Sequence, residues 1–235
     1  TREQPRSPKR KWIELGNSPN SARPRKRHRV KLYYFYWKDR GGRVRWLLEE
    51  LGVPYEAQHL DYKSMEHKGP DFTRINPLGV VPTLIDGDKT LVETGAICTY
   101  LADQYPANQL APPIDSAERG EYLQWMFFVS ATLEPAVLEV FRLKTLAEDM
   151  RAREVKAIRE KLNPLFAFLE KGLGNKSFIV GNHFSAADVM IGSTLVWARN
   201  TALLTEVDTA LWNYLNRLWE RPAYIEACSF GPREL

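Results

Sequence analysis

Two short segments combine residue types that could bind the backbone and the charged end of a small peptide. In the apolar run from Val80 to Ile85, which is typical of a strand, Pro82 interrupts the pattern. Proline lacks the N–H that a strand ladder uses, so Pro82 predicts an edge, a bulge or a cis bond. Glu93 and Thr94 begin a predicted helix, where free N–H groups and the helix dipole attract a carboxylate. Taken separately, Val81-Pro82 is more typical of a turn proline in a core strand, and Glu93-Thr94 is equally compatible with a plain helix N-cap.

Other polar residues favour structural roles. Ser185 and Asp188 have the spacing of a capping box, which predicts a helix start worth ~1 kcal/mol or more to the fold. Cys98 lies among apolar residues of a predicted helix, and we expect a buried apolar side chain there. Cys98 and Cys228 are the two cysteines, and they form no CxxC or Cys/His pattern. We therefore expect no disulfide framework, no metal site and a reducing compartment.

The first half of the chain has the pattern of a small mixed sheet flanked by helices. The pattern predicts an aromatic strand at 32–36, a helix at Arg40–Leu51 that is ended by a glycine, and a short strand at 55–60. A hairpin at 80–92 and a second helix at 94–104 are predicted to follow. A strand–helix–strand order predicts a parallel pair, and the Asp86-Gly87 turn predicts an antiparallel one.

The second half is predicted to be helical throughout. A stiff linker with Pro112-Pro113 at its centre covers 106–115 and separates a domain at 31–105 from one at 116–235. Apolar residues at helical spacing follow, Pro135 is expected to kink the first long helix, and later helices begin at Ser185 and near Asp208. A chain of 235 residues is long enough to bury two such cores.

The positive charge is concentrated at the N-terminus. Residues 1–30 hold ten Lys and Arg against two Glu, net +8, whereas the rest holds 23 basic and 27 acidic residues, net −4. We expect an uncompacted tail that is dispensable for the fold, and an acidic globular part that argues against nucleic-acid binding. Two basic clusters, Lys9-Arg10 and 23–27, are spaced like a bipartite nuclear import signal; the alternative is a solvated run of charge. No apolar run approaches the roughly 20 residues of a membrane span.

Three motifs together resemble the soluble glutathione transferase family, and bacterial-type and theta-like members in particular. Residues 76–84, followed nine residues later by 93–97, are similar to the glutathione-binding core of that family. Residues 45–52 resemble its first helix, and 181–188 its capping segment. The resemblance covers about 31–227 and implies a thioredoxin-like α/β domain followed by an all-α helical bundle.

The resemblance also implies a binding site, with glutathione as co-substrate and no metal. A cis bond before Pro82 would expose the backbone N–H and C=O of Val81, which would pair with the cysteinyl backbone of glutathione as an added strand does. Glu93 would meet the ammonium of the γ-glutamyl group and Thr94 its carboxylate. The family further implies a homodimer, detoxification and a cytoplasmic location; a nuclear location, reached through an import receptor that reads the tail, is the alternative.

The group that stabilises the thiolate is where this chain departs from the family. A thiol with a pKa near 8.5 is only a few per cent ionised at neutral pH, so it needs a stabilising partner. Tyrosine-type members place that partner at the end of the first strand, which matches Tyr34. Other members use a loop Ser or Cys, where this chain has Asp39, which cannot donate to a thiolate once ionised. The candidates are therefore Tyr34, Tyr36 if the register slips, and Arg40 as an electrostatic stabiliser.

The sequence thus predicts a glutathione transferase that acts on small hydrophobic electrophiles. The electrophile pocket is expected between Tyr36-Trp37 and the aromatic helix that carries Trp125 and Phe128, although these four residues fit a core equally well. The alternative is a non-catalytic binding or adaptor protein that uses the fold for contacts and the tail for targeting.

Overall fold

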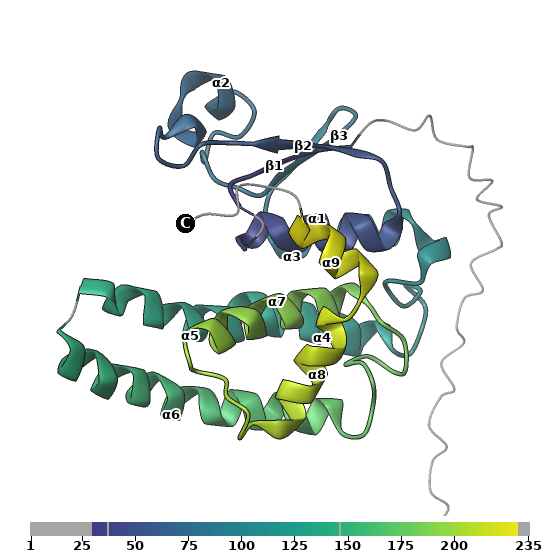
Figure 1. Ribbon diagram of the computed structural model, residues 1–235. Coiled ribbons are helices and arrows are strands. Elements are labelled where there is room, and N and C mark those ends of the chain that lie inside the picture. Colours follow the sequence, from purple (N-terminus) through teal and green to yellow (C-terminus); the bar gives the residue numbers. More distant parts are fainter. Residues whose placement is uncertain (1–29, 37, 146, 230–235) are drawn as a thin grey trace, which may run out of the picture.

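The computed structural model describes residues 30–36, 38–145 and 147–229. The predicted tail lies outside the described residues except for Val30, which belongs to the first strand and is fully buried. A small sheet with its helices lies beside a larger helical part, and the two meet along α1, α3 and α7 (Figure 1).

The sheet has four strands in the order β2-β1-β3-β4. The strands are β1 (Val30–Tyr34), β2 (Tyr55–His59), β3 (Thr83–Asp86) and β4 (Lys89–Leu91). β1 runs parallel to β2 and antiparallel to β3, which confirms the predicted mixed sheet. β1 ends at Tyr34, two residues earlier than expected, so Phe35 and Tyr36 belong to the loop before α1.

Helices cover both faces of the sheet. α1 (Arg40–Leu51) and α3 (Thr94–Gln104) pack on the face that carries Leu32 and Leu84. The 3₁₀ turn η1 (Glu66–Lys68) and the short α2 (Pro70–Thr73) lie on the other face, over Tyr33 (Figure 1). Gly52 ends α1 with φ of 61°, the left-handed cap that the sequence predicts.

From the linker onwards, the described residues contain no strand and all their regular elements are helical. The elements are η2 (Pro106–Asn108), α4 (Arg119–Phe128), a π-helical turn η3 (Val129–Leu133), α5 (Glu134–Leu138), η4 (Glu139–Thr145), α6 (Glu148–Leu173), α7 (Ala186–Asn200), α8 (Thr209–Trp219) and α9 (Pro222–Ser229). The π-helical turn ends just before Glu134-Pro135. The proline ring and its missing N–H prevent regular α-helical bonding to the residues before Pro135, which accounts for the irregular turn there. No helix in this part or in the first domain, as far as it is described, is long and apolar enough to cross a membrane.

Two features join the end of the chain to the rest. The capping box at α7 is confirmed, because the backbone N–H of Ser185 donates to Asp188 Oδ2 at 2.8 Å and the Ser185 side chain caps the helix. α9, which the sequence analysis missed, packs along α1 (Figure 1). Arg221, just before α9, forms a bidentate ion pair with Glu50 of α1 at 2.6 and 2.7 Å.

Candidate functional site

A cavity of about 330 Å³ opens between the two domains. One wall comes from the turn before β3 and the start of α3, and the other from α1 and the helical domain. The sequence-predicted residues that line it, and so are brought together, are Arg40, Val81, Pro82, Glu93 and Thr94. Residues that the sequence analysis did not single out also line it, namely Arg43, Val80, Gly95, Ser130, Glu134 and Met190.

The turn before β3 is held by a buried side chain. The Val81–Pro82 peptide bond is cis, as the resemblance implies, and the strand ladder ends at the pair Tyr33–Thr83, so Val81 lies beyond it. The side-chain amide of Asn76 donates to Val80 O at 2.9 Å and to Thr83 Oγ1 at 3.0 Å. The Asn-Pro-Leu-Gly segment therefore fixes the turn from within and leaves Val81 facing the cavity.

The start of α3 presents the second set of predicted groups. Glu93 is exposed and has φ of 69°, a left-handed conformation that is rare for a residue with a side chain and that clusters at ligand sites. Thr94 is the first residue of the helix and is buried. A Cβ on Gly95 would lie 2.9 Å from Ser130 Oγ, so glycine lets the π-helical turn approach this helix terminus.

Asp39, which the resemblance places where other members have a Ser or Cys, caps α1. Its carboxylate accepts the backbone N–H groups of Phe35 at 2.9 Å, Tyr36 at 3.2 Å and Gly42 at 3.0 Å. Burial raises the pKa of Asp39, while these backbone donors act in the opposite direction. A carboxylate engaged in this way shapes the loop and the helix N-terminus, and it offers no donor to a thiolate.

Two arginines of α1 share one carboxylate of the helical domain. Arg40 Nε donates to Glu134 Oε1 at 2.5 Å, and Arg43 Nη1 donates to Glu134 Oε2. Arg43 Nη2 donates to Thr194 Oγ1 at 3.1 Å. Burial lowers the pKa of the Arg43 guanidinium, and Glu134 opposes that shift. Arg40, with a side chain 48% exposed, is the exposed member of the group and lines the cavity.

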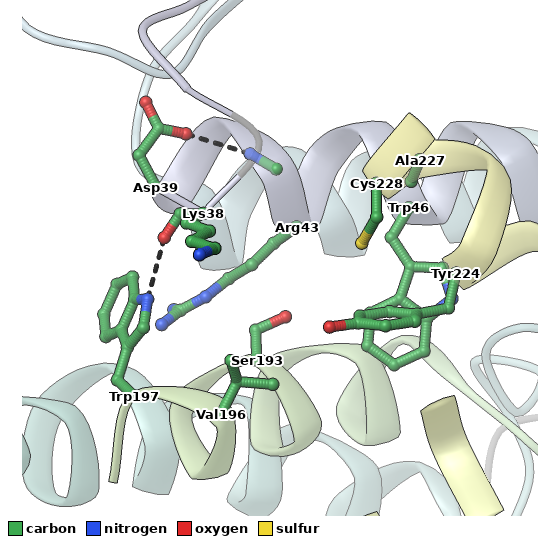
Figure 2. Close-up of a pocket in the computed structure, with 11 residues that line it drawn as sticks. Lys38, Asp39, Arg43, Trp46, Ser193, Val196, Trp197, Tyr224, Ala227 and Cys228 are labelled. Carbon is green, nitrogen blue, oxygen red and sulfur yellow. Dashed lines mark hydrogen bonds between the residues drawn. The ribbon is translucent and has the colours of Figure 1, made fainter. Parts of the chain in front are cut away.

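The loop before α1 is also tied to the helical domain, beside a second and much smaller cavity of about 30 Å³ (Figure 2). Trp197 Nε1 donates to Lys38 O at 2.8 Å, and the Arg43 guanidinium lies 4.5 Å from the centre of the Trp197 ring. Cys228 lines this cavity, and burial raises the pKa of its thiol. This space holds about one water molecule, so it is a packing defect at the domain boundary.

Tyr34 is not among the described residues that line the larger cavity. It is 6% exposed, its ring meets the His59 ring edge-on at 5.9 Å, and the Arg45 guanidinium lies 5.2 Å from its centre. A Cβ on Gly41 would come within 2.5 Å of Tyr34 Cβ, so α1 packs directly on this tyrosine. The structure therefore places Tyr34 between β2 and α1, in the core.

The residues expected to form an electrophile pocket are not brought together as a group. Trp125 is 2% exposed and, with Phe128, packs on Phe168 of α6 at ring distances of 5.1 Å. Tyr36 instead contacts the His59 ring at 6.1 Å. Trp37 lies outside the described residues. The core interpretation of Trp125 thus fits the structure better than the pocket interpretation.

A mixed four-stranded sheet, a cis-proline turn facing a helix N-terminus and an all-helical second domain define a two-domain protein built around a peptide-sized cleft. Two family models match the chain: the glutathione S-transferase N-terminal domain over residues 29–103 and the glutathione S-transferase C-terminal domain over residues 152–217.

Among curated relatives, glutathione S-transferase GstB of Escherichia coli (strain K12) is 32% identical over 181 residues, which cover 75% of this chain and 86% of that protein. A sphingomonad glutathione S-transferase solved in complex with glutathione is 30% identical, with a TM-score of 0.73, covering 84% of this chain and 96% of the other. The Xylella fastidiosa glutathione S-transferase structure is 27% identical, with a TM-score of 0.73 and the same coverage. The chain belongs to the glutathione S-transferase family, so the predicted fold and the predicted glutathione transferase are confirmed.

Proposed function

We propose that this transferase binds glutathione in the cavity between its domains and adds the thiol to small hydrophobic electrophiles. The observation that carries the proposal is that one cavity combines Val81, Glu93, Thr94 and a cationic side chain, Arg40. Its volume of about 330 Å³ falls in the range of small-ligand sites.

Each part of glutathione has a counterpart on the wall formed by the first domain. The N–H and C=O of Val81 lie beyond the β1–β3 ladder and would pair with the cysteinyl backbone. The N-terminus of α3 would receive the γ-glutamyl carboxylate with help from the Thr94 hydroxyl, because free N–H groups and the helix dipole favour an anion there. Exposed Glu93 would meet the ammonium group.

We propose Arg40 as the group that stabilises the thiolate. Arg40 lines the cavity and Tyr34 does not, and Asp39 has no donor to offer. A guanidinium beside the sulfur favours the ionised thiol and would lower its pKa by about one to two units. With an aryl halide, the sulfur lone pair forms the new S–C bond, the halide leaves with its bonding electrons, and the thiol proton goes to solvent. Tyr36 is half-buried after β1 and does not line this cavity either; we keep it as the proposed contact for the electrophile.

The assembly and location remain proposals. We expect a homodimer, a role in detoxification and a cytoplasmic location; the nuclear import signal lies outside the described residues. Light scattering at micromolar concentration should give twice the chain mass, and 27.1 kDa would contradict a dimer.

The central test combines binding and turnover. Calorimetry with glutathione and turnover of a generic aryl halide should both be positive for the full chain. R40M should raise the pKa of the bound thiol by about one unit and lower kcat/KM at neutral pH about tenfold. Y34F should leave both unchanged, as should the matched control R74M, whose arginine is exposed on α2 and pairs with Asp71.

The outcomes separate the alternatives. A loss of kcat/KM in Y34F but not in R40M would return the catalytic role to Tyr34. Glutathione binding by the full chain without turnover of any electrophile would favour the non-catalytic binding protein. Absence of glutathione binding would contradict the proposed function altogether.

A further inference from the structure

Among the described residues of the helical domain, Glu134 is the one whose side chain binds both Arg40 and Arg43 at the cavity. It is 5% exposed and lies at the start of α5, directly after the π-helical turn. Each carboxylate oxygen accepts one guanidinium, from Arg40 and from Arg43. We propose that Glu134 is a positioning residue that holds the Arg40 guanidinium where it stabilises the thiolate of glutathione; this rests on the function proposed above.

Arg40 needs such a partner because its side chain is exposed and few neighbouring groups restrict its rotamer. Its side chain is 48% exposed, and a long exposed arginine samples many rotamers, at a cost when one is selected. Only its Nε has a partner among the described residues, which is Glu134 Oε1. The bond to Nε fixes the plane of the guanidinium and leaves the two Nη groups to donate into the cavity.

Glu134 is itself fixed from the other side. Arg43 is 1% exposed and is held by Thr194 of α7 and by the Trp197 ring. Figure 2 shows this arginine crossing from α1 towards α7, beside the bond from Trp197 to Lys38. Arg43 therefore anchors Glu134, and Glu134 in turn anchors Arg40, so that the helical domain orients a group of the glutathione-binding domain.

The group formed by Arg40, Arg43 and Glu134 favours an anion at the free end of Arg40. Arg40 and Arg43 share a single carboxylate, so this group of three carries one net positive charge. The other charged or titratable groups near it are Asp39, engaged with backbone N–H groups, exposed Glu93, and Cys98, whose pKa burial raises to about 12 so that it is neutral. A thiolate at the free Nη groups would balance the excess charge of this group of three, whereas the carboxylates of Asp39 and of Glu93, which lines the cavity, act in the opposite direction.

The direction in which the pKa of the glutathione thiol changes when Glu134 is replaced separates a positioning role from a simple charge effect. As a nearby negative charge, Glu134 disfavours a thiolate, so its neutralisation alone would lower the thiol pKa. As the partner that holds Arg40, its removal releases the guanidinium, so the thiol pKa would rise. A purely structural residue would move neither the pKa nor the pH profile.

We would measure the pH dependence of thiolate absorbance for glutathione bound to the full chain, together with the pH profile of kcat/KM. E134Q should raise the thiol pKa by about one unit and lower kcat/KM at neutral pH about tenfold, and the loss should shrink at alkaline pH. The double variant R40M/E134Q should match R40M, because Glu134 acts through Arg40. R74M is again the matched control.

An unchanged or lowered pKa in E134Q, or additive losses in the double variant, would overturn the positioning role. If E134Q does not fold, the variant E134Q/R43M removes the unpaired buried guanidinium, and its thiol pKa should lie about one unit above that of R43M alone. A full chain that fails to bind or turn over glutathione contradicts the proposed function itself. If the full chain lowers the pKa of the bound thiol, R40M raises that pKa and E134Q leaves it unchanged, only this inference is contradicted.

Discussion

Replacing Asp188 with alanine should destabilise the protein far more than the loss of a helix cap. The carboxylate is fully buried. It accepts the Ser185 N–H and hydroxyl on one oxygen, and the Ile179 N–H at 2.8 Å and the Tyr214 hydroxyl at 2.6 Å on the other. The cap is worth about 1 kcal/mol. The two remaining buried donors would lose their acceptor at about 1–2 kcal/mol each, so we expect a loss of about 3–5 kcal/mol in the free energy of unfolding.

Urea unfolding followed by circular dichroism measures this loss, and two variants divide it. S185A removes only the hydroxyl cap and should cost about 1 kcal/mol. Y214F removes one donor and should cost about 1–2 kcal/mol, because the Asp188 carboxylate keeps its other partners. If D188A costs no more than S185A, the bonds to Ile179 and Tyr214 contribute nothing and the reasoning is refuted.

The pH dependence gives an independent check. Burial raises the pKa of Asp188 in the folded protein, against the hydrogen bonds that act to lower it. The folded chain then keeps this proton to a higher pH than the unfolded chain does, so stability falls as the pH rises from about 3.9 through the folded pKa. D188N lacks this titration and should lose that part of the pH slope; an identical slope in both proteins would argue against a raised pKa.

Three further outcomes are expected. T94A should weaken glutathione binding by roughly 1–3 kcal/mol in calorimetry, since a charged group of the ligand loses a hydrogen bond, and an unchanged affinity would mean that the site is misplaced. G172A should lower the free energy of unfolding by about 1–3 kcal/mol, because its Cβ would lie 2.2 Å from the rigid Trp125 ring; a neutral result would show that the ring can move. A chain that starts at Val30 should keep its melting temperature within a few degrees and bind glutathione. A chain that starts at Lys31 lacks the fully buried Val30 and should lose about 1.5–3 kcal/mol in the free energy of unfolding. Equal stability of the two truncated chains would contradict the assignment of β1.

Most of the fold could be predicted from the sequence because its signals are local. The apolar spacing of α1 and the glycine after it define that helix and its end, and the Asp-Gly turn defines the β3–β4 hairpin. The capping box at Ser185 likewise depends on residues three positions apart. α9 was missed because its eight residues are too few to show a period, and its contacts are with α1, far away in the sequence.

The residues proposed to bind glutathione could be predicted from the sequence, whereas the choice among Tyr34, Tyr36 and Arg40 as the proposed stabiliser of the thiolate needed the structure. Val81-Pro82 and Glu93-Thr94 are adjacent pairs whose backbone roles follow from proline chemistry and from a helix terminus. Tyr34 fits the family pattern by position, but only the packing of α1 through Gly41 shows that its ring is enclosed by β2 and α1. Asp39 stands directly before the predicted helix, which is the local pattern of an N-cap and accounts for its bond to the Gly42 N–H, whereas its bonds to the Phe35 and Tyr36 N–H groups depend on how the loop folds back.

The sequence by itself determined the two-domain order, the sheet pairing and the residues proposed to meet the backbone and the charged end of glutathione, since these depend on spacing within one element or one turn. The tertiary structure alone decided which charges line the cavity beside them. Arg40 and Glu134 are 94 residues apart and Arg43 and Thr194 are 151 apart, and a pair so distant is joined only by the packing of one domain on the other. Because the energy of a buried charge depends on every group that folding places around it, such a site cannot be inferred from neighbours along the chain.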